Sequence, residues 1–301
     1  MSDKEKTKLE AYADGQSMPK RQSPRRKKSS AQGSVRKKTT TATQKKKKTE
    51  QPSHTVLLDQ FTDKIEEDHN IIFKPNVGPQ TDFLAASERE VLYGGSAGGG
   101  KSYAMLADPL RFMDVPAFAG VLLRHTTEEL RELITKSQEM YPKIWPGIKW
   151  SERKMTWTAP SGATLWLSYL DKDQDVTRYQ GLAFSWIGFD ELTQWATPFA
   201  WNYMRSRLRT ADPSLPLSMR ATTNPGGRGH HWVKKMFIDP APAGNSFIAT
   251  DIESGEDLKY PAGHAKAGKP LFKRRFIPAR LRDNPYLAQQ GDYEAMLLSL
   301  P

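Results

Sequence analysis

The stretch "GSAGGGKS", Gly95–Ser102, has the residue types and spacing needed to hold a phosphate group. Two glycines lie five positions apart, and a lysine and a serine follow the second one, which is the pattern G-x-x-x-x-G-K-S. Glycines let backbone N–H groups turn toward an anion, and a helix that begins here adds its N-terminal dipole. We predict that Lys101 reaches the outer phosphates of a nucleotide and that Ser102 binds Mg²⁺. The predicted nucleotide-contacting residues of the loop are Gly95, Ser96, Ala97, Gly98, Gly99, Gly100, Lys101 and Ser102.

Two acidic residues, Asp190 and Glu191, end the apolar segment "SWIGF". An acid at this place in phosphate-loop ATPases completes the Mg²⁺ shell, which assigns Asp190 as a metal ligand alongside Ser102. Glu191 would then orient and deprotonate the attacking water. The alternative is a strand that simply ends in two acids at its solvated edge. A glutamate directly after the aspartate is typical of ATPases of the additional-strand, catalytic-glutamate type, so the pair favours motors, helicases and translocases.

A third segment, "RATTNP", places Thr222, Thr223 and Asn224 at the end of another apolar run. Polar side chains at the carboxyl end of a strand face the bound nucleotide in parallel sheets. They would sense the γ-phosphate and pass its loss to a neighbouring part of the protein. An ordinary turn before Pro225 is the alternative for this short motif.

Strands alternating with helices must position these residues, and that alternation predicts a mainly parallel sheet covered by helices on both faces. The predicted fold is an α/β P-loop NTPase of the additional-strand type. The segment 118–125, "FAGVLLRH", is the candidate for the extra strand between the strand of the phosphate loop and the strand of Asp190. Thr126 and Glu129 fit a capping box at the start of a helix. The other predicted strands cover 90–95, 184–191, 217–224, 246–250 and 273–281, a hairpin covers 154–170, and helices cover 54–72, 101–113, 126–141, 198–210, 229–238 and the end of the chain.

Positive charge is concentrated at the N-terminus. Residues 1–50 carry 16 Lys+Arg and 5 Asp+Glu, a net of +11, whereas residues 51–301 carry 29 of each. We expect residues 1–53 to be a disordered basic arm, because so few apolar residues cannot offset the loss of chain entropy on folding. Such an arm would attract nucleic-acid phosphates, although a solubilising tail is the alternative. The absence of cysteine excludes disulfides, and we find neither a signal peptide nor an apolar run long enough to cross a membrane.

Five segments follow one another in this order: "GPQTDFL", "LYGGSAGGGKS", "VLLRHTTEEL", "RYQGLAFSWIGFDELTQW" and "ATTNPGG". Together they resemble the ATPase domain of phage terminase large subunits. The resemblance runs from about residue 70 to residue 301. It implies a motor that hydrolyses ATP with Mg²⁺ and moves double-stranded DNA into a procapsid. The two most specific segments are those around Asp190 and Asn224.

The resemblance implies roles for further residues. Gln80 matches the glutamine that contacts adenine, and Thr222–Asn224 matches the motif that couples hydrolysis to movement. An arginine must also stabilise the phosphoryl-transfer transition state. Arg178 is the first choice, supplied to a neighbouring subunit in a ring, and Arg124 is the second. Either arginine could instead be a plain surface residue.

The resemblance also sets expectations for domains and partners. We expect the ATPase domain to cover residues 54–278 and a lid or linker segment to cover 279–301, with no nuclease activity in this chain. Expected partners are double-stranded DNA, a portal protein, a small terminase subunit and further copies of the chain, with no membrane. The expected place of action is the host cell cytoplasm and not the mature virion. Alternatives are a helicase-type ATPase stimulated by nucleic acid, or a non-catalytic DNA-binding assembly subunit.

Overall fold

The computed structural model describes residues 73–96 and 98–285. The predicted basic arm, the predicted helix 54–72, Ala97 and the predicted closing helix beyond residue 285 lie outside the described residues.

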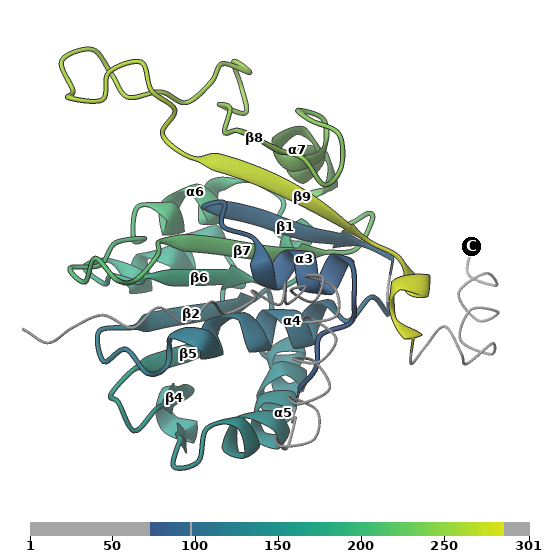
Figure 1. The fold of residues 1–301 in the computed structure, drawn as a ribbon, viewed down its shortest axis with the longest axis vertical. Coiled ribbons are helices and arrows are strands. Elements are labelled where there is room, and N and C mark those ends of the chain that lie inside the picture. Colours follow the sequence, from purple (N-terminus) through teal and green to yellow (C-terminus); the bar gives the residue numbers. More distant parts are fainter. Residues whose placement is uncertain (1–72, 97, 286–301) are drawn as a thin grey trace, which may run out of the picture. The chain divides into compact units, whose positions relative to one another are not determined.

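A nine-stranded mixed sheet, in the order β3-β4-β5-β2-β6-β7-β1-β9-β8, forms the centre of the described part (Figure 1). The six strands from β5 to β9 in that order are parallel, and antiparallel strands flank them at both edges. This confirms the prediction of a mainly parallel sheet. The strands are β1 Glu90–Gly95, β2 Ala119–Arg124, β3 Lys149–Ser151, β4 Thr156–Thr158, β5 Thr164–Tyr169, β6 Trp186–Phe189, β7 Ser218–Thr223, β8 Ser246–Ile248 and β9 Lys273–Ala279.

The strand between the phosphate-loop strand and the strand of Asp190 is β7, not β2. Leu92 of β1 and Phe189 of β6 both pair with Ala221 of β7. The prediction that the segment 118–125 takes this place is therefore wrong, because β2 lies on the other side of β6. Thr222 and Thr223 end β7, as predicted for the end of this apolar run, and they therefore lie between the two motif strands. Chain order cannot distinguish the two positions, since either parallel strand can be reached by a helical crossover.

The helices begin close to the predicted limits, but two of them end early. The helix predicted over 198–210 ends at Arg205, and the helix after the phosphate loop also stops short. The capping box of Thr126 and Glu129 is present and starts an 18-residue helix. The helix after the phosphate loop ends at Ala107 and continues as a 3₁₀ turn, since Pro109 has no N–H to donate. The helices are α3 Pro79–Ala85, α4 Lys101–Ala107, α5 Thr127–Ile144, α6 Phe199–Arg205 and α7 His230–Val233, which runs on into a π-helical turn.

Both faces of the sheet are buried, each by its own apolar cluster. Val91 and Tyr93 of β1 pack with α3, α4 and α5, whereas Leu92 between them packs with α6 and α7. This three-layer arrangement holds the carboxyl ends of the strands at one edge of the sheet. No helix within residues 73–96 and 98–285 is long and apolar enough to cross a membrane.

Candidate nucleotide-binding site

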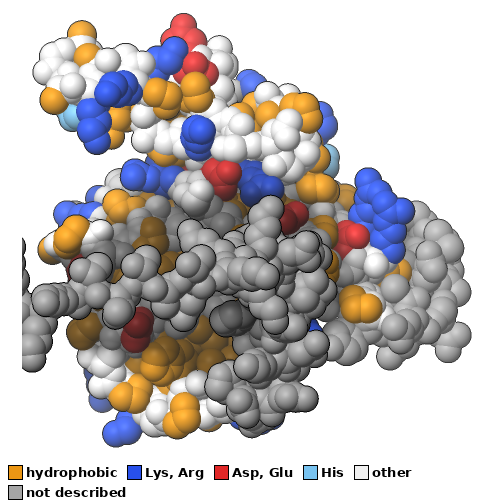
Figure 2. All heavy atoms as spheres, in the orientation of Figure 1, with side chains coloured by type: hydrophobic (Ala, Val, Ile, Leu, Met, Phe, Trp, Pro, Cys, Tyr) orange, Lys and Arg blue, Asp and Glu red, His pale blue; other side chains and the backbone are white. Residues whose placement is uncertain are grey.

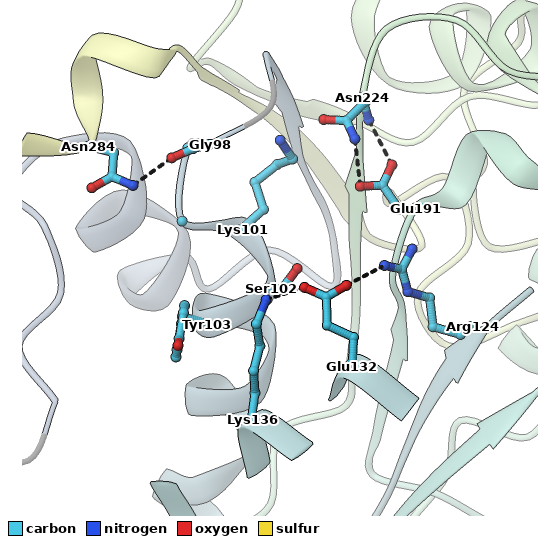
Figure 3. Close-up of a pocket in the computed structure, with 12 residues that line it drawn as sticks. Gly98, Lys101, Ser102, Tyr103, Arg124, Glu132, Lys136, Glu191, Asn224 and Asn284 are labelled. Carbon is cyan, nitrogen blue, oxygen red and sulfur yellow. Dashed lines mark hydrogen bonds and ion pairs between the residues drawn. The ribbon is translucent and has the colours of Figure 1, made fainter. Parts of the chain in front are cut away.

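A cavity of about 360 Å³ opens at the carboxyl ends of β1, β2, β6 and β7 (Figure 3). This edge is where ligands bind in open parallel sheets. The phosphate loop forms one wall, α5 a second, and the residues that follow β6 and β7 a third. The lining residues are Gly98, Gly99, Gly100, Lys101, Ser102, Tyr103, Arg124, Glu132, Lys136, Glu191, Asn224 and Asn284.

Lys101 is folded back onto its own loop. Its Nζ donates to the backbone carbonyl of Ser96 at 2.8 Å, and the side chain is buried. Burial lowers the pKa of Lys101, while the nearby carboxylates of Glu191 and Asp190 act in the opposite direction. An anion in the cavity would therefore find an ammonium group with little competing solvent.

Close packing explains why the loop is so rich in glycine. A Cβ on Gly95 would lie 1.9 Å from the carbonyl oxygen of Ala279 in β9, so no side chain fits there. Gly100 has a φ of +73°, and a Cβ on it would lie 2.8 Å from Nε2 of Gln80. The glycines thus serve the contact of the loop with β9 and with Gln80 as well as its approach to a phosphate.

Gln80 lies behind the loop and does not line the cavity. Its Nε2 donates to the carbonyl of Gly100 at 2.9 Å, and its Oε1 accepts from the backbone N–H of Asn76 at 2.6 Å. The side chain therefore holds the turn that leads into α4. The contact of Gln80 with adenine stays a prediction.

Asp190 is completely buried and faces two partners. Thr222 Oγ1 donates to one carboxylate oxygen, and Arg124 Nε lies 3.1 Å from the other, Oδ2. Oδ2 has no hydrogen-bond partner of good geometry among the described residues. Carboxylate and hydroxyl oxygens are the hard ligands that Mg²⁺ prefers, so Asp190 and the cavity-lining Ser102 suit this ion.

Glu191 has an uncommon backbone and a firmly held side chain. Its φ and ψ are 61° and 56°, a left-handed conformation that is costly for a residue with a Cβ and is typical of functional sites. Asn224 Nδ2 donates to Oε1 at 2.7 Å, and the Asn224 backbone N–H donates to Oε2 at 3.1 Å. Burial raises the pKa of Glu191, Asp190 raises it further, and Lys101 and Arg124 oppose this rise.

Thr222 and Thr223 connect the end of β7 to the residues that follow β6. Thr222 Oγ1 accepts from the backbone N–H of Glu191 at 2.9 Å while it donates to Asp190. Thr223 Oγ1 donates to Thr193 Oγ1 at 2.9 Å. A shift of β7 would therefore move the acid pair.

The structure separates the two candidate arginines. Arg124, at the end of β2, lines the cavity beside Asp190. Arg178 lies outside this cavity, with a side chain that is 45% exposed. It donates to the carbonyl of Tyr169 at 2.8 Å and lies over the Tyr169 ring. Arg178 is therefore not brought to the site of its own chain.

Four lining residues have no counterpart among the predicted ones. Glu132 and Lys136 of α5 form an ion pair at 2.5 Å, and Lys136 also lies over the ring of Tyr103. Asn284 donates to the carbonyl of Gly98 at 2.6 Å. The i,i+4 spacing of Glu132 and Lys136 was visible in the sequence, but not that this face of the helix points toward the phosphate loop.

A second cavity, of about 290 Å³, adjoins the first at Glu191. It shares Arg124, Glu191 and Asn224 with the first cavity and is otherwise formed by the turn after β6 and the Pro225–Gly227 turn. Glu191 can therefore be approached from a side that the phosphate loop does not occupy.

Comparison with known protein families finds a match over more than half of the chain. The family described as "Terminase large subunit, T4likevirus-type, N-terminal" matches residues 92–262. No curated protein sequence matches the chain.

Solved structures of similar fold include the large terminase from a thermophilic bacteriophage. One crystal form of it has a TM-score of 0.54 at 16% identity over 76% of this chain and 51% of that chain. Its complex with ATP-gamma-S has a TM-score of 0.50 at 16% identity, with 76% and 50% covered. The complex with ADP has a TM-score of 0.50 at 15% identity, with 76% and 51% covered. The likeness confirms the fold, and the chain spans about half the length of these relatives.

Proposed function

This chain belongs to the terminase large-subunit family, and we propose that it is an ATP-hydrolysing motor that moves double-stranded DNA into a procapsid. The observation that carries the proposal is that Lys101, Ser102 and Glu191 line one cavity, with the buried Asp190 directly before Glu191 in the chain. The chain separation of these residues is large, so their convergence reflects the fold and not local sequence.

The roles follow from the geometry of the site. Lys101 leaves the carbonyl of Ser96 and takes up the outer phosphates, while the loop N–H groups and the N-terminus of α4 hold the rest of the triphosphate. Glu191 accepts a proton from the attacking water, for which its raised pKa suits it better than an ordinary carboxylate. Asn224 keeps the Glu191 carboxylate in place until the water is aligned.

Mg²⁺ would be held by Ser102 and Asp190, and it would neutralise charge on the transferred phosphoryl group. Arg124 already lies 3.1 Å from the Oδ2 atom of Asp190. Mg²⁺ at Asp190 would share the charge compensation that this guanidinium gives the buried carboxylate. Glu132, whose Oε2 lies 4.0 Å from Arg124 Nη2, is the nearest other carboxylate for it.

Arg178 is proposed to act on a neighbouring subunit, which implies a homo-oligomeric ring. Its exposed position away from the cavity of its own chain supports this assignment over a role in the same subunit. The second cavity beside Glu191 is wide enough to admit a side chain from outside.

Coupling is assigned to Thr222, Thr223 and Asn224. The hydrogen bonds of Thr222 and Asn224 connect the end of β7 to both members of the acid pair, and Thr223 bonds to Thr193. The partners proposed with duplex DNA are a portal protein and a small terminase subunit, and the place of action is the host cell cytoplasm. The proposal includes no membrane partner.

The proposal assigns no nuclease reaction to this chain. Within the described residues no group of three or more His, Asp or Glu side chains is placed to hold a metal ion. Incubation with plasmid DNA and Mn²⁺ should leave the plasmid intact, and cleavage would overturn this part of the proposal.

The decisive experiment measures ATP hydrolysis with and without duplex DNA for the wild type and Glu191→Gln. The variant should lose about 10²–10⁴ in kcat, which is the usual contribution of a general base, and should still bind nucleotide. Glu139→Gln, the same change at an exposed position of α5, is the matched control. Wild-type turnover in Glu191→Gln would overturn the proposal.

A second measurement separates a duplex motor from a helicase. A motor that moves along duplex DNA should displace a third strand bound in the major groove without opening the duplex. Separation of a forked duplex without third-strand displacement would instead identify a helicase.

A further inference from the structure

The segment between β8 and β9 makes two exposed turns of opposite charge (Figure 1). Residues 251–257 hold four Asp and Glu and no Lys or Arg. Residues 258–270 hold three Lys and no Asp or Glu, and residues 273–282, which form β9 and the turn after it, add five Lys and Arg and no acid. Since residues 51–301 as a whole are balanced in charge, this is a strong local separation.

The second turn is an ordered hairpin, which we call the basic hairpin, residues 259–270. Tyr260 N–H donates to the carbonyl of Lys269, and Gly268 N–H donates back to Tyr260, each at 3.0 Å. The ring of His264 stacks on Tyr260 with centroids 4.4 Å apart, and Lys266 lies over the same ring. The backbone that carries the lysines is therefore held in one shape before any partner arrives.

Part of the positive charge here is used within the fold. Arg274 is buried against Glu90, and Arg275 Nε donates to the carbonyl of Gly244 at 2.8 Å. Lys259 pairs with Asp257 at 3.2 Å. Lys266, Lys269 and Lys273 are exposed, and within residues 73–96 and 98–285 no carboxylate forms an ion pair with any of them. Figure 2 shows blue Lys and Arg side chains along this projection, with the red acidic side chains gathered at its top.

The chemistry of the hairpin fits a repeating anion and not a single bound ion. Lysine is a point charge on a flexible stem, so it binds phosphate without the directed geometry of an arginine fork. Charges spread over several exposed positions match the evenly spaced phosphates of a nucleic-acid backbone. No base-reading side chain such as Asn, Gln or Arg lies within residues 259–270.

The basic hairpin is also connected directly to the nucleotide site. Lys273 begins β9, and Ala279 ends it at the phosphate loop, where its carbonyl accepts from the N–H of Ser96 at 3.1 Å. One strand therefore leads from the hairpin to the loop. A contact at the hairpin would act on β9, the same strand whose last residue packs against Gly95.

We propose that Lys266, Lys269 and Lys273 bind the sugar–phosphate backbone of duplex DNA, independently of its sequence. This inference rests on the proposed function, which identifies the bound polyanion as duplex DNA. It adds the surface of the protein that contacts the DNA.

The test uses the full chain and the triple variant Lys266→Gln/Lys269→Gln/Lys273→Gln. The affinity of each protein for a fluorescent 30-base-pair duplex is measured from low to high KCl. Loss of three phosphate contacts should reduce the slope of log K against log salt by about 2–3, because each contact contributes about 0.9. Duplexes of different sequence should give the same change.

The control is Lys143→Gln/Lys149→Gln/Lys154→Gln, which removes the same charge from exposed positions around β3. The N-terminal residues are common to all three proteins, so their share of the slope cancels. An equal slope for the two triple variants would overturn the proposal.

Weaker self-association of the hairpin variant with an unchanged slope would overturn it too, and would assign the hairpin to a second copy of the chain. A wild type that hydrolyses no ATP, while the hairpin variant loses slope, would reject the proposed motor function and leave the DNA-binding surface standing.

Discussion

Asn224 holds Glu191 by both of its carboxylate oxygens, one through the side-chain amide at 2.7 Å and one through the backbone N–H at 3.1 Å. Glu191 meanwhile has a left-handed backbone that would relax if nothing restrained it. The pair therefore joins the end of β7 to the group that we propose activates water. Asn224 acts through Glu191 and is a positioning residue in this arrangement.

Asn224→Ala should lower kcat for ATP by about 10-fold to 100-fold, a part of what a general base contributes, and should leave KM nearly unchanged. The loss arises because the carboxylate is no longer aimed at the water, while the phosphate contacts remain. Steady-state kinetics at several ATP concentrations check this. Asn202→Ala, an exposed asparagine on α6, should behave as the wild type. A rise in KM without a fall in kcat would show that Asn224 binds the nucleotide instead.

Replacing Arg178 and replacing Arg124 should have different effects on the free energy of unfolding and on kcat. Arg178→Ala should keep the stability of the wild type, since the side chain is 45% exposed, but should lose about 10³–10⁵ in kcat. Arg124→Ala should lose about 3–5 kcal/mol of unfolding free energy, because Asp190 is left as an unpaired buried charge. Urea unfolding and ATPase assays on both variants check this.

Mixing inactive variants tests whether Arg178 acts between subunits. Glu191→Gln supplies a normal Arg178 to its neighbour, and Arg178→Ala supplies a normal Glu191. If the arginine acts in trans, the mixture regains turnover under conditions where the ring forms. A mixture as inactive as its parts, with rings present, would return the role to Arg124 in the same subunit.

The parts of the site that the sequence predicted are those that depend on local chain geometry. A parallel sheet binds its ligands at the carboxyl ends of its strands. The lysine and serine after the glycine turn, and the two acids after an apolar strand, all follow such strand ends. The misplaced extra strand shows the limit, since whether β2 or β7 lies beside β1 is decided by long-range packing. The same holds for Glu132 and Lys136, whose helix face is set by how α5 packs on the sheet.

The density of glycine in the phosphate loop yields a prediction about β9. Gly95→Ala brings a Cβ within 1.9 Å of the Ala279 carbonyl, so the end of β9 must move. Overpacking of this kind costs about 1–3 kcal/mol and should also weaken nucleotide binding, measured with a fluorescent ADP. Gly162→Ala is the control, because Gly162 has a φ of +97° but open space around it. Only the strain of the left-handed backbone, about 1–2 kcal/mol, applies there, and nucleotide affinity should not change.

Glu90 lies away from the nucleotide site, and its ionisation should make the free energy of unfolding depend on pH. It is fully buried between Arg205 and Arg274 at the start of β1. Burial raises its pKa, but the two arginines outweigh this effect, so its pKa lies below the ordinary value. A lowered pKa means that the ionised form stabilises the fold above the unfolded pKa of about 4.3, and that this stability is lost as pH falls through the folded pKa.

Glu90→Gln should therefore cost about 3–5 kcal/mol of unfolding free energy at pH 7, since Arg274 is left buried without its counter-charge. The difference from the wild type should shrink as pH falls from the unfolded pKa of about 4.3 toward the lowered folded pKa, because unfolding of the wild type then takes up a proton. Asp239→Asn, in the exposed ion pair with Lys234, should cost no more than about 1 kcal/mol at either pH. Urea titrations of the three proteins at about pH 7 and about pH 3.5, on either side of the unfolded pKa, decide the matter. A loss for Glu90→Gln that is equally large at both values would mean that shape, and not the ion pair, accounts for the effect.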